Sequence, residues 1–563
     1  MTDGSRVAYQ PYSPTSEDLK GTCVYGDSCD PEVQRRFRVN GYNDVWATCV
    51  FLVNLLGIIV LGAVQLGTGK WSALFGSSPS SSTTVATTSA APATTLTTFT
   101  TRAATVTTTS TGSVETAANF GNGCLAGLGF AVGLTLVFLV LMKVFAKAFI
   151  WVANSIFIFI GIGIAVAGGM LGNSGLGLLI CGIVLTLISA LFLLCVRHRI
   201  PFSALLLECS TMCVMRFHGT VVFAFVTLLI GIVYYVWWVI SILPTLASVS
   251  GGAWQGLLVL FVFLFFFTTQ VFTGVVHVTT SGTVATWFFV GNGQMPPNPS
   301  VASFKRAMTT SFGSICFGSL IVGLLKTLEY IVRAMISDRN FLLKCIAMCI
   351  LGCIRRLMEY FNLYAFSHIA IYGCDYMTAA KLTWNFIQNF VWSAVINDVL
   401  VDRVFALLTV FNACAVGVIC FFVFSKSILA ALGGALVAIV VNNVVFNTVA
   451  SGVVTMMVCV AEAPDVFHAK HPELSTKLNE AVITMQQGCC GGDAAPVPPQ
   501  VVVVQAMHQP SRGYGQPMVA ATPYPPQGVP YGQPMVAATP YPPQGAPYGQ
   551  AATAAAKDAM MLL

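Results

Sequence analysis

The sequence predicts an all-α polytopic membrane protein with about ten transmembrane helices and disordered cytoplasmic tails. Of its 563 residues, 56% are hydrophobic and only 9% are charged. A soluble globular domain has roughly 25% charged residues, so this composition excludes an ordinary soluble protein. Apolar runs long enough to cross a bilayer, at about 20 residues each, recur along the chain.

The first 120 residues contain one predicted span between two polar segments. Residues 1–44 form a polar arm, which we place in the cytoplasm because Arg35, Arg36 and Arg38 precede the first transmembrane helix at 45–66. That helix also acts as an uncleaved anchor, since no cleavable signal peptide is visible. Residues 67–120 form an extracellular Ser/Thr-rich stalk loop, whose composition suits a glycoprotein with O-linked glycans and equally an unmodified flexible loop.

The transmembrane core is predicted at 121–463. Its expected spans are 121–142, 148–171, 176–196, 221–246, 254–273, 274–290, 311–336, 405–424 and 428–460. The segment Gly274–Val290 is short and rich in small and hydroxyl side chains, and we expect it to be a broken helix that crosses by itself. The distribution of Lys and Arg places the basic segment 338–402 in the cytoplasm. This placement requires that residues 274–290 cross the membrane, so that the chain is outside before residue 291.

Segment 338–402 is interpreted as a cytoplasmic amphipathic insert that lies at the membrane face. Its apolar residues leave open a second interpretation, in which Leu342–Ile354 belongs to a re-entrant helix. Cys345, Cys349 and Cys353 recur every four residues in this segment, which places them on one face of a helix. We expect packing or lipidation for these thiols and no metal site, because a zinc site needs paired Cys and His ligands.

The stretch from Ser311 to Lys381 contains the most specific motifs. It begins with GSICFGSLI at Gly313–Ile321, continues with a Cys-spaced basic segment, and ends with a block that includes Asn362, Gly373 and Lys381. These blocks resemble the C-terminal core of the choline transporter-like family, strongly between about residues 274 and 464. The residues Asn43-Asp44-Val45-Trp46 resemble the start of the family's first helix, and look closer to its fungal and protist branch.

The resemblance implies a transporter of choline or a related organic cation or amino-alcohol that supplies phospholipid synthesis. It also implies a multi-pass protein of the plasma membrane with both termini in the cytoplasm, and coupling to proton exchange is compatible with it. No catalytic or cofactor motif is visible, so we expect neither an enzyme nor a cofactor. A non-transporting membrane scaffold and a cation channel remain alternatives, and the dispersed charge of +6 argues against nucleic acid.

A quaternary ammonium has no N–H group to donate, so aromatic faces are the side chains suited to hold it. We therefore predict substrate-binding residues among the aromatic side chains of the fifth to seventh spans, with a hydroxyl to meet the alcohol. The same rings also suit an interfacial aromatic belt. The predicted set is Tyr234, Trp237, Trp238, Trp254, Trp287 and Thr280.

Charged residues inside an apolar helix usually pair or mark a solute path. Lys326, Glu329 and Arg333 have spacings that place them on one helical face, which predicts an ion pair that serves either structure or gating. His277 titrates near neutral pH when unperturbed and is the candidate for proton coupling, although packing explains an isolated His equally well.

The region 464–563 is predicted to be a cytoplasmic Pro-rich repeat tail. It begins with a polar helix near 472–485, followed by Cys489 and Cys490, a candidate acylation pair. A seventeen-residue Tyr- and Pro-rich unit starts at Tyr514 and repeats at Tyr531. Such a sequence suits a spacer or a ligand for adaptor proteins with aromatic grooves.

Overall fold

A computed structural model describes residues 22–23, 36–39, 41–68, 96–249, 251–291, 295–335 and 341–489. Most of the predicted disordered arm, residues 69–95 of the stalk loop, Cys490 and the repeat tail lie outside the described residues, whereas residues 96–120 of the expected loop form the first part of a helix. The helices are α2 (Val45–Gly67), α4 (Leu96–Met170), α5 (Leu176–Val196), α6 (Ile200–Arg216), α7 (Gly219–Ala247), α8 (Gly252–Val290), α9 (Pro299–Met308), α10 (Phe312–Met335), α11 (Phe341–Tyr372), α12 (Tyr376–Val423), α13 (Ile428–Glu462), α14 (Pro464–Lys470) and α15 (Pro472–Cys489).

The architecture confirms an all-α polytopic membrane protein. Among the described residues, eight helices are long and apolar enough to span a bilayer: α2, α4, α5 continued through α6, α7, α8, α10, α12 and α13. Two-residue strands, β1 (Thr22–Cys23) and β2 (Arg38–Val39), form one small antiparallel pair. Eight helices account for the ten expected spans because α4 and α8 each cover two of them.

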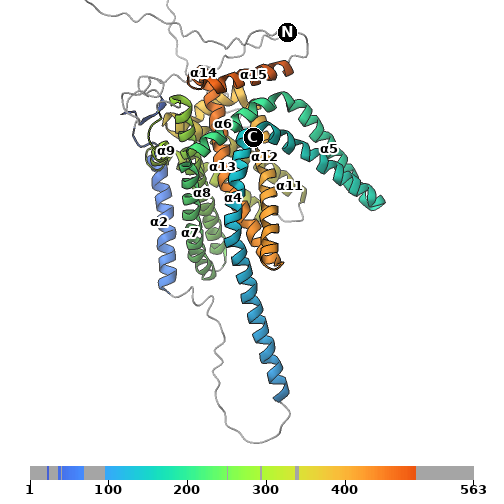
Figure 1. The fold of residues 1–563 in the computed structure, drawn as a ribbon. Helices are drawn as coiled ribbons and strands as arrows, with labels where there is room; N and C mark the ends of the chain where they lie inside the picture. Colours follow the sequence, from blue (N-terminus) through green and yellow to red (C-terminus); the bar gives the residue numbers. More distant parts are fainter. Residues whose placement is uncertain are drawn as a thin grey trace, which may run out of the picture. The chain divides into compact units, whose positions relative to one another are not determined.

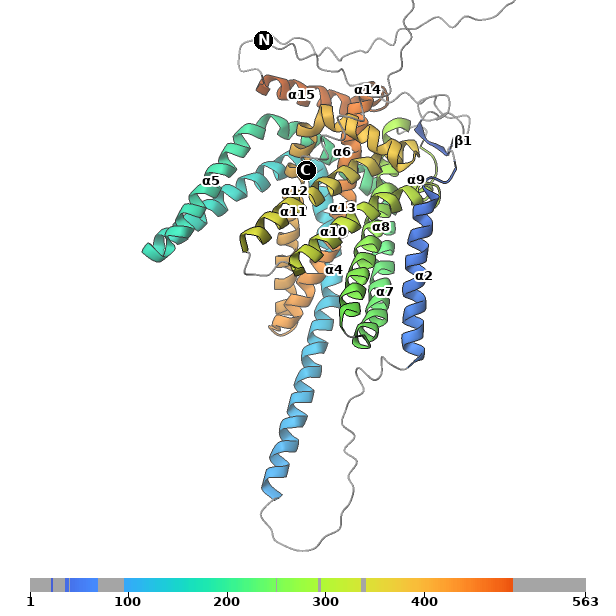
Figure 2. The same ribbon diagram turned by 180° about the vertical axis from the view of Figure 1, so that it is seen from behind.

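The two spans expected at 121–142 and 148–171 lie within α4, which bends at Phe145, where the backbone leaves helical geometry at φ −119° and ψ 28°. The second leg of α4 pairs with α5 as a hairpin (Figures 1 and 2). Glycines allow this close approach, since a Cβ at Gly161 would lie 2.5 Å from Oγ1 of Thr186 and one at Gly168 would lie 2.3 Å from the nitrogen of Leu179.

The prediction of a helix break at Gly274 was wrong, because α8 runs without interruption from Gly252 to Val290. The hydroxyls that suggested a broken helix bond to their own backbone: Thr279 donates to the carbonyl of Val275 at 2.7 Å, and Thr280 donates to that of Val276 at 3.0 Å. Small side chains occur here because residues 277–290 are all buried. The composition therefore marks a tightly packed central helix, and residues 252–290 form one helix that is long and apolar enough to span a bilayer.

Segment 338–402 contributes α11 and the first half of α12, and these helices pack against α8, α10 and α13. Tyr364, Ser367 and His368 of α11 are completely buried, as is Thr383 of α12. Both helices are therefore parts of the bundle. Their cytoplasmic placement stays a prediction.

The residues of the family-like motifs meet in space. Asp44 accepts hydrogen bonds from Oγ of Ser314 at 2.6 Å and from the backbone nitrogen of Tyr376 at 2.9 Å. Asn43 donates to the carbonyl of Gly373 at 2.6 Å. A Cβ on Gly313 would lie only 2.2 Å from the backbone oxygen of Asn43, so glycine is required at this contact. The motifs thus join α2, α10, α11 and α12.

The segments at the two ends of the described chain contact the same end of α8. Phe37 packs edge-on against Phe289 at 6.2 Å between ring centroids. After α14, His471 stacks on Trp287 at 4.0 Å, and its Nε2 lies 3.2 Å from the backbone oxygen of Trp287 and 3.3 Å from that of Phe288. The carbonyls at the end of α8 thereby receive a donor. The expected helix near 472–485 is confirmed as α15.

Candidate functional site

A cavity of about 470 Å³ lies among α7, α8, α11, α12 and α13. Its volume falls in the range of about 300–1,000 Å³ that is typical of small-molecule sites. All five helices belong to the packed bundle, and α7 and α8 lie side by side in both views (Figures 1 and 2). The cavity therefore has walls from segments far apart in the sequence, with lining residues from Ala224 to Val454.

Asp402 of α12 is the acidic side chain in the lining of this cavity. It is exposed, and in the described part of the chain no Lys, Arg or His forms an ion pair with it. A carboxylate within a membrane-spanning helix is costly unless it meets a positive partner or water. The cavity is therefore suited to a positively charged ligand.

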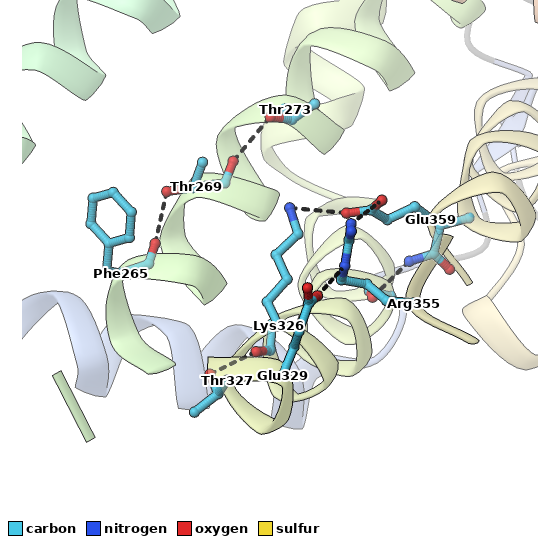
Figure 3. Close-up of polar contacts among 11 residues, drawn as sticks. Phe265, Thr269, Thr273, Lys326, Thr327, Glu329, Arg355 and Glu359 are labelled. Carbon is cyan, nitrogen blue, oxygen red and sulfur yellow. Dashed lines mark hydrogen bonds and ion pairs between the residues drawn. The ribbon is translucent and has the colours of Figure 1, made fainter. Parts of the chain in front are cut away.

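Aromatic and hydroxyl groups from α7 and α8 also line the cavity. Tyr235 and Phe272 present rings to the cavity. The hydroxyl of Tyr235 donates to Oγ1 of Thr269 at 3.1 Å. Thr269 and Thr273 give their own protons to backbone carbonyls one turn earlier in α8, at 2.8 and 3.1 Å (Figure 3). Their oxygens consequently remain acceptors for the hydroxyl of a ligand.

His277 lines the cavity and connects α8 with α11 and α13. Its Nε2 lies 2.9 Å from the carbonyl of Leu363, so this nitrogen carries a proton and donates it. Its Nδ1 lies 2.9 Å from Oγ of Ser451, which is also 2.9 Å from the carbonyl of Asn447. The Ser451 proton can point to a neutral imidazole, or to Asn447 when Nδ1 is protonated. Both protonation states are fully hydrogen bonded without moving a heavy atom.

The predicted aromatic residues of α7 lie outside the cavity. Tyr234 is buried beside α2 and α8, where its hydroxyl lies 3.1 Å from Oγ1 of Thr268. Trp237 donates from Nε1 to the carbonyl of Ile58 at 3.3 Å, and Trp238 packs against Phe265 at 5.2 Å. These rings hold α7 to α2 and α8.

The other predicted substrate-binding residues also lie elsewhere. Trp254 is exposed near the start of α8, Trp287 is buried against His471, and Thr280 is buried with its hydroxyl bonded to its own helix. Of all the predicted site residues, only His277 lines the cavity. The binding role of the six predicted substrate-binding residues stays a prediction, and the geometry gives it no support.

The three predicted charged residues of α10 belong to a cluster completed by Arg355 and Glu359 of α11. Figure 3 shows Lys326 and Glu329 with these two residues. Lys326 lies 3.0 Å from Glu359, and Arg355 contacts both Glu329 at 2.6 Å and Glu359 at 2.8 Å. Arg333 is 3.9 Å from Glu329. Sequence spacing identified the pair within α10, but the stronger contacts join the two helices. This cluster ties α10 to α11.

Asp402, Phe272 and Asn447 line the cavity but were not predicted as binding residues from the sequence, whereas Tyr235 was one of the candidate rings. A signal for Asp402 was present, because the acidic residue lies in the apolar run VLVDRVFALL. We assigned that residue to a cytoplasmic insert and began the span at Phe405. Asp402 was therefore not considered as a charge inside the membrane. In the described residues no group of three His, Cys, Asp or Glu side chains is arranged to hold a metal ion.

Comparison with known proteins relates the bundle to membrane transporters. Residues 180–465, which include every helix that lines the cavity, match the family described as "Plasma-membrane choline transporter". Protein PNS1 of Eremothecium gossypii is 32% identical over 389 residues, covering 62% of this chain and 70% of that protein. Protein PNS1 of Kluyveromyces lactis is 30% identical over 410 residues, covering 65% of this chain and 72% of that protein.

A CTL-like protein of Dictyostelium discoideum is 32% identical over 293 residues, which is 50% of this chain and 53% of the relative's own length. The chain thus spans little more than half of this relative. The similarity to fungal and Dictyostelium proteins agrees with the expected fungal and protist branch. The family comprises transporters and not enzymes, and this chain belongs to it as a member of the plasma-membrane choline transporter (choline transporter-like) family.

Proposed function

We propose that this protein carries choline or a related amino-alcohol cation across the plasma membrane, supplying phospholipid synthesis. The observation that supports the proposal most directly is the cavity of about 470 Å³ with the Asp402 carboxylate on one wall and the rings of Tyr235 and Phe272 on another. A methylated ammonium fits this combination because it needs negative charge and ring faces but no hydrogen-bond acceptor.

The expected affinity is moderate. Each cation–π contact contributes about 0.5–2 kcal/mol, and a charge pair about 4 Å apart in a partly wet cavity contributes about 1–4 kcal/mol. Together with apolar contacts, these terms give dissociation constants between roughly micromolar and millimolar. A carrier needs such weak binding because it must release its substrate on the far side.

The orientation of the protein is part of the proposal. Phe37 and His471, close to the two ends of the described chain, contact the same end of α8. This contact supports placing both termini on one side of the membrane. Arg35, Arg36 and Arg38 beside the first span assign that side to the cytoplasm.

We also propose that His277 exchanges a proton during transport. Its hydrogen bonds to Leu363 and Ser451 serve the neutral and the protonated ring equally well. A protonated imidazole and a substrate cation would compete for the same cavity, so binding one favours release of the other. In liposomes, a pH gradient should drive choline uptake by the wild type and should have no effect on choline uptake by His277→Gln.

The main experiment measures uptake of labelled choline and ethanolamine by purified protein in liposomes. Asp402→Asn should raise KM about tenfold to a hundredfold, as expected for the loss of one charged partner. Phe272→Leu should raise KM about fivefold through the loss of one ring contact. Glu473→Gln is the matched control, because this carboxylate is exposed on α15 and lies outside the cavity.

Three outcomes would contradict the proposal. Absence of saturable uptake by the correctly folded wild type would favour a membrane scaffold. A cation conductance that does not saturate would favour a channel. Wild-type KM in Asp402→Asn would show that the cation binds somewhere else.

A further inference from the structure

A second cavity, of about 420 Å³, lies between α2 and α8 and is separate from the first. α2 packs mainly against α7 and α10, which leaves this space on its α8 side. The walls are almost entirely apolar and include the rings of Phe261, Phe263 and Phe267. Val50 and Val53, at the edge of the cavity, are exposed. Because both helices are long and apolar enough to span the bilayer, the edge faces lipid.

One polar side chain interrupts this apolar lining. Asn54 is only 7% exposed, and its Nδ2 donates to Oγ1 of Thr268 at 2.9 Å. Thr268 gives its single proton to the carbonyl of Leu264 at 2.9 Å, so it meets both Asn54 and Tyr234 as an acceptor. This arrangement fixes the orientation of the amide. Oδ1 of Asn54 is consequently left buried without a hydrogen-bond partner.

An unpartnered acceptor in a membrane interior costs about 1–3 kcal/mol, which a ligand hydroxyl would recover. The α2 residues of the lining extend from Val50 to Leu61, about 16 Å of helix. Asn54 lies toward one end of that length. The cavity thus matches a molecule with one hydroxyl near an end and a long apolar body.

We propose that this cavity binds a membrane sterol, with its hydroxyl donating to Oδ1 of Asn54 and its ring system lying against Phe261, Phe263 and Phe267. A phospholipid acyl chain would fill the space but would leave the amide oxygen unsatisfied. The cavity has no charged side chain in its lining, so an organic cation would find no counter-charge there. The proposal does not depend on choline being the substrate.

The sterol site adjoins the first cavity through consecutive residues of α8. Thr268 bonds to Asn54, and the next residue, Thr269, lines the first cavity and accepts from Tyr235. Tyr234 and Tyr235 connect to the same two threonines from α7. Occupation of the sterol site therefore stabilises the wall that carries Tyr235.

The test uses a photoreactive diazirine analogue of cholesterol with the full-length protein in phosphatidylcholine nanodiscs. Labelled peptides are expected from α2 and α8, with competition by excess cholesterol. Cholestene, which lacks the hydroxyl, should compete about fivefold less well, as expected for the loss of one hydrogen bond. This comparison needs no variant, so it does not depend on the folding of a mutant.

Gly57 allows the cavity to be filled from its own wall. Gly57 belongs to the lining, and a Cβ there would meet nothing within 4 Å. Gly57→Leu should reduce sterol labelling about tenfold or more, because the added side chain occupies the space of the ligand. Gly133→Leu is the matched control, since Gly133 is exposed on α4 and its Cβ also meets nothing within 4 Å.

The proposal predicts that sterol labelling is lost in Gly57→Leu and kept in Gly133→Leu. Labelling that maps outside α2 and α8 would overturn it. Equal competition by cholestene and cholesterol would also overturn it, and would indicate an acyl chain or another apolar occupant. If Gly57→Leu does not fold, the mapping and the competition by cholestene decide the question with the wild type.

Discussion

Arg355 holds α11 to α10, and replacing it with methionine is expected to loosen this pair of helices. Its Nε lies 2.6 Å from a carboxylate oxygen of Glu329, and its Nη1 lies 2.8 Å from one of Glu359. In Arg355→Met, Glu359 keeps Lys326 at 3.0 Å. Glu329 keeps only the long contact of 3.9 Å to Arg333.

The magnitude follows from burial. An exposed ion pair contributes about 0.2–1 kcal/mol, and breaking a fully buried pair costs about 3–5 kcal/mol. The side chains of Arg355 and Glu329 are each 20% exposed, which places this pair between the two limits. We therefore expect Arg355→Met to lower the free energy of unfolding by about 2 kcal/mol.

A double-mutant cycle with Glu329→Gln measures the interaction by thermal unfolding in detergent. The expected coupling energy is about 1–2 kcal/mol. Arg356→Met is the control, because this neighbouring side chain is exposed and no described ion pair involves it. A coupling energy below about 0.3 kcal/mol, or an equal loss of stability in Arg356→Met, would refute the reasoning.

Two further predictions concern helix packing and pH. Gly127→Val should lower the free energy of unfolding by about 1–3 kcal/mol and reduce expression, because a Cβ at Gly127 would lie 2.6 Å from Cα of Gly434 on α13. Gly133→Val is the control, because a Cβ at Gly133 meets nothing within 4 Å, and its size-exclusion profile should match that of the wild type. Burial lowers the pKa of His471 from its usual 6.5, so the contact with α8 favours neutral imidazole and weakens as the pH falls below that value. Protection of the α14 and α15 amides, measured by hydrogen exchange and corrected for the pH dependence of the intrinsic exchange rate, should fall from pH 7.5 to 5.5 in the wild type, and a fall of the same size in His471→Gln would count against this cause.

The fold class followed from the sequence because apolar composition and run length alone determine which segments enter a bilayer. The boundaries of α8 did not follow, because the hydroxyl-rich segment at 274–290 has two opposite interpretations. Thr279 and Thr280 are compatible with an irregular, cavity-lining segment and with a tightly packed helix whose hydroxyls bond to its own carbonyls. Only the burial of the segment on all sides distinguishes them.

The candidate site was harder to predict than the fold. Ring composition predicted a binding role for aromatic residues of α7, but neighbouring residues on one helix point to different partners. Tyr234 contacts Thr268 in the interior, and Tyr235 faces the cavity one residue later. The sequence alone contains no information on which face of α7 meets α8. Asp402 was missed because its segment was assigned to the cytoplasm as a unit.

The motif residues show a different limit. The family resemblance rested in part on four residues, which the structure places at one junction between helices: Asn43, Asp44, Gly313 and Gly373. The close approach at Gly313, where a Cβ would lie 2.2 Å from a carbonyl, explains why glycine is needed there. Spacing along the chain did not reveal this contact, because it joins segments about 270 residues apart.

The most direct test of the central claim compares choline with 3,3-dimethylbutan-1-ol, a neutral molecule of the same shape, by competition against labelled choline on purified protein. The wild type should bind choline at least about tenfold more tightly, since charge alone separates the two ligands. In Asp402→Asn this difference should shrink to about threefold, with the rings of Tyr235 and Phe272 supplying the remainder. Equal binding of both ligands by the wild type, or an unchanged difference in Asp402→Asn, would contradict the account.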